Sequence, residues 1–208
     1  MKKLLCTSVA GLLIGNALPA FAASTTDLTV QGLIVPSACA PSLSLNGNID
    51  LGRISVKDLN QDTRTNLTRQ TLQLEVNCEA ATLFAMQTTD NRAESGTLGE
   101  YGVGVTNAGE RIGGFYMLLD KASADEAPVQ PIASLNNGTT WFTFFEDDAW
   151  SKNIIVSIQE PGAARVPVPR KNTQMELSVA PFILATKDLT LTEDTVLDGS
   201  VTVTVRYL

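Results

Sequence analysis

The segment GSVTVTVRYL, Gly199–Leu208, alternates apolar and polar residues along its length. Val201, Val203, Val205 and Tyr207 fall on one face, and two threonines and an arginine fall on the other. Because successive side chains of a strand point to opposite faces, this pattern predicts a half-buried β-strand. A strand at this place has no following hairpin partner, so we expect one of its edges to be free.

A second regular strand pattern stands near the start of the chain, in DLTVQGLIVPSAC, Asp27–Cys39. Leu28, Val30, Gly32 and Ile34 would share one face of this strand. A glycine in the apolar row of a strand is unusual, because it has no side chain to pack. The two regular strands at opposite ends of the chain suggest that the first supplies what the body lacks.

The first 22 residues predict a secretory signal. Two lysines precede an apolar run, and Ala20-Phe21-Ala22 places small residues where signal peptidase cuts. The alternative, a membrane anchor, would need about 20 apolar residues and charged flanks on both sides. We therefore expect export, with cleavage after Ala22 and loss of Cys6 with the signal.

Composition excludes several classes of function. Without residues 1–22 the chain keeps 13 of its 15 basic residues and all 22 acidic ones, a net charge of −9. This charge disfavours binding to nucleic acid. The sequence contains no histidine, which excludes Ser-His-Asp and Cys-His catalysis and histidine-rich metal sites. We expect neither an enzyme nor a protein with a metal or cofactor.

Cys39 and Cys78 remain after cleavage, and an isolated pair in an oxidising compartment predicts a disulfide. A metal or redox pair is the alternative, but no histidine and no C-x-x-C motif supports it. Their strands should be neighbours, because NIDLGRI and TLQLEVN would then lie side by side or one strand apart.

The rest of the chain is a series of short β-branched and aromatic runs separated by Gly, Asn, Asp and Pro clusters. Val56–Leu67 is the best place for a short helical piece. The pattern predicts an all-β sandwich over residues 39–208, preceded by a tail over residues 23–38. The predicted core positions are Leu74, Val76, Phe84, Met86, Phe182 and Leu184.

The stretch WFTFFEDDAW, Trp141–Trp150, permits several interpretations. Its aromatic rings would suit sugar binding, but a strand with one core face, and Trp150 at its edge, explains them as well. Glu146–Asp148 could bind calcium, although the alternating ligand spacing of a calcium loop is missing. Asn66 and Asn137 match glycosylation sequons, which matter in a eukaryotic secretory route.

Several motifs together resemble the pilin subunits of the bacterial chaperone–usher pathway. They are the tail around Gly32, SACAPSLSL followed by NIDLGRI, TLQLEVNC, FAMQTTDNR, FYMLLDKASADEAPVQPI, APFILAT and the penultimate Tyr207. The resemblance covers most of the chain after the signal. In that family the glycine before the terminal strand stands further upstream than Gly199.

The resemblance implies an incomplete immunoglobulin-like β-sandwich that lacks its seventh strand. The groove would border Val201–Tyr207 and take first a periplasmic chaperone strand, then the donor segment Leu28–Ile34 of the next subunit. Other implied partners are an outer-membrane usher, neighbouring pilins and an unknown host receptor, with the fimbrium on the bacterial surface as the destination. The alternative is a fimbrial adhesin or exported carbohydrate-binding module. A secreted enzyme is disfavoured, because no nucleophile motif is present.

Overall fold

The computed structural model describes residues 28–30 and 38–208. The chain divides into an N-terminal unit, Met1–Ile34, and a body, Val35–Leu208. The predicted signal, most of the predicted tail, Gly32 and Ile34 lie outside the described residues. Leu28 and Val30 are described, and both side chains are exposed.

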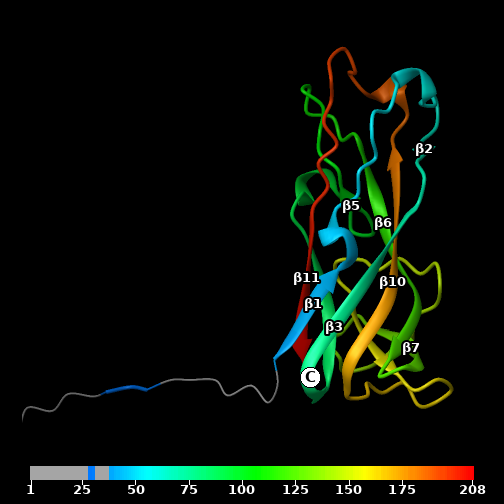
Figure 1. Ribbon diagram of the computed structural model, residues 1–208. Coiled ribbons are helices and arrows are strands. Elements are labelled where there is room, and N and C mark those ends of the chain that lie inside the picture. The colour runs from blue at the N-terminus through cyan, green and yellow to red at the C-terminus, as the bar shows by residue number, and fades with distance from the viewer. Residues whose placement is uncertain (1–27, 31–37) are drawn as a thin grey trace, which may run out of the picture. The chain divides into compact units, whose positions relative to one another are not determined.

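The described part of the body is built of strands joined by loops and four single-turn 3₁₀ helices (Figure 1). The strands are β1 Cys39–Leu43, β2 Thr65–Asn66, β3 Gln70–Thr82, β4 Phe84–Asp90, β5 Tyr101–Gly102, β6 Gly113–Ala124, β7 Ala127–Ser134, β8 Phe142–Thr143, β9 Ile155–Gln159, β10 Arg170–Ile183 and β11 Val201–Tyr207. The 3₁₀ helices are η1 Ser44–Gly47, η2 Val56–Asp58, η3 Ala93–Ser95 and η4 Thr186–Asp188. The all-β prediction is confirmed, and η2 falls where a short helical piece is predicted.

All eleven strands belong to one antiparallel sheet, whose main path runs β1-β3-β10-β6-β7-β9-β4-β11. The bend of the sheet lies at the β6–β7 hairpin. These strands pair where Ala122–Ala124 meet Ala127–Val129, and β7 then continues against β9. The sheet thus curls back until its two end strands, β1 and β11, contact each other (Figure 1). The result is an antiparallel sheet that is nearly closed.

The core lies between the facing halves of this curled sheet. Alternation along β3 buries every second side chain from Leu72 to Cys78, and the opposite side chains are half-buried or exposed. Of the predicted core residues, Leu74, Val76, Phe84, Met86 and Phe182 are buried. Leu184, which follows the end of β10, is half-buried.

The placement of Trp150 at the edge of an aromatic strand is wrong, because its side chain is fully buried. Its backbone N–H donates to the Met117 carbonyl at 2.8 Å and its indole N–H to the Ile154 carbonyl at 3.2 Å. These bonds hold the ring inside the core, where it cannot stack on a sugar. Phe144 is buried as well, whereas Phe145 is 63% exposed.

The predicted disulfide is present between Cys39 and Cys78, with their α-carbons 4.0 Å apart. The two cysteines are register partners at the start of the β1–β3 pairing. The expectation that NIDLGRI forms the paired strand is wrong. That segment, residues 48–54, contains no strand, and β1 ends before it at Leu43.

The double substitution Cys39→Ser and Cys78→Ser should lower the free energy of unfolding by about 4 kcal/mol, because the bridge closes a loop of 39 residues. Urea denaturation followed by circular dichroism measures this change. A loss below about 1 kcal/mol would contradict a stabilising role for the bridge.

Candidate strand-binding groove

Strand β11 presents one free edge. Its other edge pairs with β4 over its whole length, from Val201 opposite Asp90 to Tyr207 opposite Phe84. β1 likewise pairs on one side alone, with β3. Within the described residues no strand is hydrogen-bonded to the second edge of either. Two open edges therefore face each other where the sheet fails to close.

The side chains of β11 follow the predicted alternation from Val201 to Val205, whereas Arg206 is half-buried and Tyr207 is exposed. Val201, Val203 and Val205 are half-buried and pack against the core, whereas Thr202 and Thr204 are exposed. An edge strand with an apolar inner row can accept a further strand, because main-chain hydrogen bonds give affinity and alternate side chains enter pockets.

A groove of about 770 Å³ opens beside the first residues of β11, at Val201 and Val203. One wall is residues 47–54, and the other is residues 191–201 together with Val203. The floor comes from β3, β6 and β10 and is apolar. Its residues are Leu72, Phe115, Met117, Leu177, Val179 and Ile183.

Gly199, in one wall of the groove, lies close against Phe115 of the floor. A Cβ at this position would lie 2.8 Å from Phe115 Cε1 and 3.3 Å from the Gly102 carbonyl oxygen. The absence of a side chain thus allows the chain to pass over the Phe115 ring on its way into β11. Substitution here would push the ring or the wall into the groove.

At the other end of the edge, Tyr207 bridges the two open strands. The Cys39 backbone N–H donates to the Tyr207 hydroxyl at 3.0 Å. The Tyr207 side chain therefore links the two edges at this end. The gap is closed at this end and open beside Val201 and Val203.

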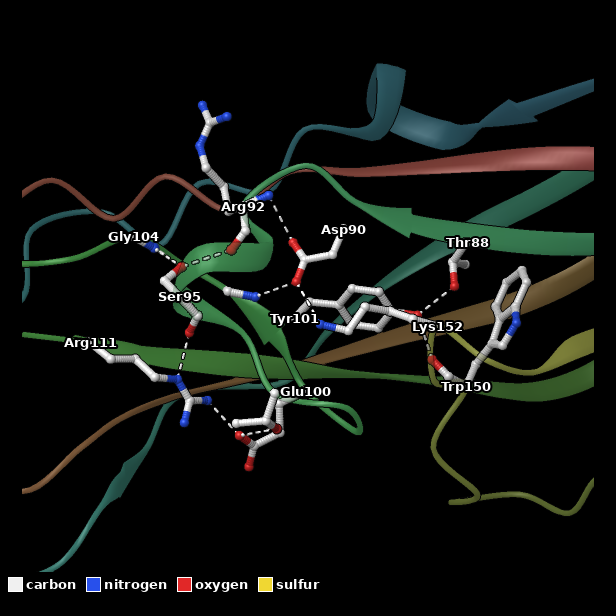
Figure 2. A network of polar contacts seen from close by, with 12 residues as sticks. Thr88, Asp90, Arg92, Ser95, Glu100, Tyr101, Gly104, Arg111, Trp150 and Lys152 are labelled. Atoms are coloured by element: carbon white, nitrogen blue, oxygen red, sulfur yellow. Dashed lines mark hydrogen bonds and ion pairs between the residues drawn. The ribbon is translucent and has the colours of Figure 1, made fainter. Parts of the chain in front are cut away.

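A buried polar network lies beside the start of β11, where Asp90 pairs with Val201 (Figure 2). The Asp90 carboxylate, whose side chain is fully buried, accepts bonds from the backbone N–H groups of Arg92 and Gly102 and from Lys152 Nζ at 3.0 Å. Asp90 is also the register partner of Val201. The network therefore fixes the loop after β4 at the mouth of the groove.

Tyr101 lies at the centre of this network (Figure 2). Its hydroxyl donates to the Trp150 carbonyl at 2.7 Å and lies 2.6 Å from Thr88 Oγ1. Burial raises the pKa of Tyr101 to about 12; the Asp90 charge adds to this effect and the Thr88 hydrogen bond opposes it. The phenol is accordingly a neutral, structural group.

Glu100 ties the outer part of the same loop to β6. Its carboxylate accepts bonds from Tyr116 at 2.7 Å and from Thr97 at 3.0 Å, and it pairs with Arg111. Partial burial alone would raise the pKa of Glu100. The hydrogen bonds from Tyr116, Arg111 and Thr97 and the charge of Arg111 outweigh burial, so the pKa of this carboxyl is lowered.

Two residues of the acidic cluster at Glu146–Asp148 make contacts within the body. Asp147 pairs with Arg69 at 3.1 Å, and Asp148 accepts the Phe145 backbone N–H at 2.8 Å. Among residues 28–30 and 38–208, no group of three acidic or cysteine side chains could hold a metal ion. No helix in that part of the chain is long and apolar enough to span a membrane.

The predicted site residues divide into two groups. The four predicted groove-edge residues, Val201, Val203, Val205 and Tyr207, all lie on β11, and two of them, Val201 and Val203, line the groove. Leu28 and Val30 belong to the other unit, and Gly32 and Ile34 are not described. The sequence interpretation missed the floor and the wall at residues 47–54. The apolar residues Ile49, Leu51 and Ile54 among polar neighbours are the signal that could have identified that wall.

Comparison with known proteins relates the chain to uncharacterised groups. A family described as "Protein of unknown function (DUF1120)" matches residues 28–100, from the predicted tail to the loop after β4. Uncharacterized protein YhcF of Escherichia coli (strain K12) is 24% identical, over 95% of this chain and 98% of that protein. Protein GltF of the same organism is 26% identical, over 100% and 98%. These descriptions name no activity.

The raised pKa of Tyr101 predicts a loss of stability in alkali. Below pH 10 the phenol is protonated in both the folded and the unfolded chain. As the pH rises from 10 to about 12, the unfolded chain loses this proton first, so the free energy of unfolding falls by roughly 2–3 kcal/mol. Urea unfolding at several pH values measures the slope.

Tyr101→Phe is the control for this effect. The variant should be less stable by about 1–3 kcal/mol at neutral pH, because the Trp150 carbonyl loses its buried donor. It should also lack the part of the alkaline slope that comes from residue 101. An unchanged slope would show that another group causes the loss.

Proposed function

We propose that the protein is a structural subunit of a bacterial surface fimbria that polymerises by donor-strand exchange. The observation that carries this proposal is the apolar groove beside the free edge of β11. In the proposed cycle a periplasmic chaperone strand fills the groove first, and an outer-membrane usher then delivers the subunit to the fibre. The tail of the next subunit replaces the chaperone strand.

The dimensions and chemistry of the edge suit a strand as occupant. The seven residues of β11 span about 23 Å at 3.3 Å each, and the predicted donor segment Leu28–Ile34 has the same length. Covering about 400 Å² of apolar groove is worth on the order of 10 kcal/mol. Such a gain is comparable with the net stability of a whole domain, so an empty groove favours capture of a strand.

The N-terminal segment supplies the matching pattern. Leu28 and Val30 are almost fully exposed, at 89% and 86%, and alternate with polar neighbours. Gly32 continues the same row in the sequence and suits a place where a groove is too shallow for a side chain. A tail that fills the groove of another copy joins subunits head to tail, which builds open filaments.

The proposal includes a finer description of the fold. The nearly closed sheet would be an incomplete immunoglobulin-like sandwich whose missing strand belongs between β1 and β11. The Tyr207–Cys39 contact supports this description, because it joins the two edges through a side chain. The same proposal places the protein in the periplasm in transit and then on the cell surface. It assigns no enzymatic activity, metal, cofactor or nucleic acid.

A fimbrial adhesin or carbohydrate-binding module is the second candidate. One observation favours it: Phe145 is exposed beside a shallow pocket that Asp120, Lys121 and Glu146 also line. The burial of Trp150 removes the aromatic face that a sugar would use most readily. The strand-binding groove is therefore the better-supported site.

Val30→Asp in the otherwise unchanged chain tests the donor role. A carboxylate in an apolar groove costs several kcal/mol, so polymerisation should slow at least ~100-fold. Thr29→Asp is the matched control, because residue 29 faces away from the predicted apolar row. Light scattering and electron microscopy of filaments measure assembly. Equal assembly by both variants would sink the donor role.

Val203→Asp tests the groove itself, with Thr202→Asp as the matched control on the exposed face of β11. The first variant should lose assembly at least ~100-fold, and the second should assemble normally. Circular dichroism establishes whether each body is folded. A folded Val203→Asp protein that assembles at the ordinary rate would contradict the proposed site.

A further inference from the structure

Residues 45–54, which include the groove wall at residues 47–54, are attached to the body mainly through side chains. We call these residues the strap. Ile49, Leu51 and Ile54 are half-buried and line the groove. After η1, within the described residues 48–54, the backbone N–H groups make two bonds, Asn48 N–H to the Leu45 carbonyl and Gly52 N–H to Asp50 Oδ1. Both bonds stay inside the strap.

Firm attachments lie on either side of the strap. Before it, Leu43 pairs with Leu74 in the sheet, and the Gln73 backbone N–H donates to Ser44 Oγ at 2.9 Å. After it, the Asn60 carbonyl accepts the Thr186 backbone N–H at 3.1 Å. The strap is thus tethered at both ends and free of ladder hydrogen bonds between them.

The contact across the groove mouth is weak. Arg53 approaches Asp194 of the opposite wall at 4.0 Å, and both side chains are fully exposed. Exposed ion pairs of this kind contribute little, because water and salt screen them. Apolar contact with the floor is therefore the main interaction that holds the strap in place.

The start of the strap has an unfavourable backbone conformation. Leu45, Asn46 and Gly47 have φ values of 54°, 54° and 71°, so three consecutive residues are left-handed. Glycine adopts this conformation freely and asparagine tolerates it, but it costs roughly 1–2 kcal/mol at leucine. The Leu45 side chain is also 72% exposed, so burial does not compensate this cost. The backbone at Leu45 is therefore strained in this conformation.

We propose that the strap is a displaceable cover of the groove, which closes on the floor when no strand is bound and lifts at Leu45–Gly47 when a strand enters. The inference rests on the proposed function and adds regulation to it. Ile49, Leu51 and Ile54 shield the floor from water in the unfilled subunit. An incoming strand of alternating apolar residues takes over these contacts and relieves the strain at Leu45.

The test uses the full-length Val30→Asp chain, so that its own tail does not compete, and a synthetic peptide with the sequence of residues 24–35. The exposure of the strap is measured by the rate at which the thiol of Leu51→Cys reacts with N-ethylmaleimide. Peptide mass mapping identifies the modified residue. Leu98→Cys, on an exposed loop residue, is the matched control. Hydrogen exchange at β11 reports peptide binding independently.

Saturating peptide should protect the β11 amides and raise the reaction rate at residue 51 at least ~10-fold, with no change at residue 98. Protection of β11 with an unchanged or lower reaction rate at residue 51 would show that the strap does not move. That result would overturn the proposed displacement of the strap and leave the proposed function standing. Unprotected β11 amides would overturn both.

The hinge provides a second test. Leu45→Gly removes the left-handed cost in the closed position, so peptide uptake should slow about fivefold or more. Asn46→Gly is the matched control and should change the rate less, because asparagine already tolerates this conformation. Uptake by Leu45→Gly that is equal to or faster than that of the unchanged chain would contradict a strained hinge.

Discussion

The free edge of β11 is the constraint on which the rest of the structure depends. A strand in the middle of a sheet satisfies its backbone groups on both sides, whereas β11 does so with β4 alone among the described residues. Its inner valines are needed for the core, so the strand cannot turn away from the protein to become an ordinary polar edge. The opening of the sheet between β1 and β11 follows from this conflict.

The surrounding structure holds the two edges at this separation. The disulfide fixes β1 to β3 at one end, and the Tyr207 hydroxyl receives the Cys39 N–H across the gap. At the other end, the buried Asp90 carboxylate anchors the loop after β4 through two backbone N–H groups and Lys152. Fully bonded buried charges of this kind make a rigid frame, because losing any one bond is costly.

The two walls of the groove differ in how firmly hydrogen bonds attach them to the body. The wall at residues 191–201 is tied to the body, for example by the Asp198 backbone N–H to the Val103 carbonyl at 2.9 Å. The facing strap has apolar side chains in the groove but no ladder bonds in the described residues. Such an arrangement allows one wall to guide an entering strand while the other yields.

The sequence by itself determined the all-β class, the Cys39–Cys78 bridge, the bounds of β11 and most of the named core residues. These features depend on local alternation or on a cysteine pair, and both can be recognised in the amino-acid sequence alone. The tertiary structure decided how far the sheet curls, because closure depends on strand pairings between distant segments. It also decided the burial of Trp150, which follows from its bonds to Met117 and Ile154. The strap could likewise be recognised only in the tertiary structure. The alternation of Ile49 and Leu51 in the sequence indicates a buried face, but it does not show that residues 48–54 have no strand partner.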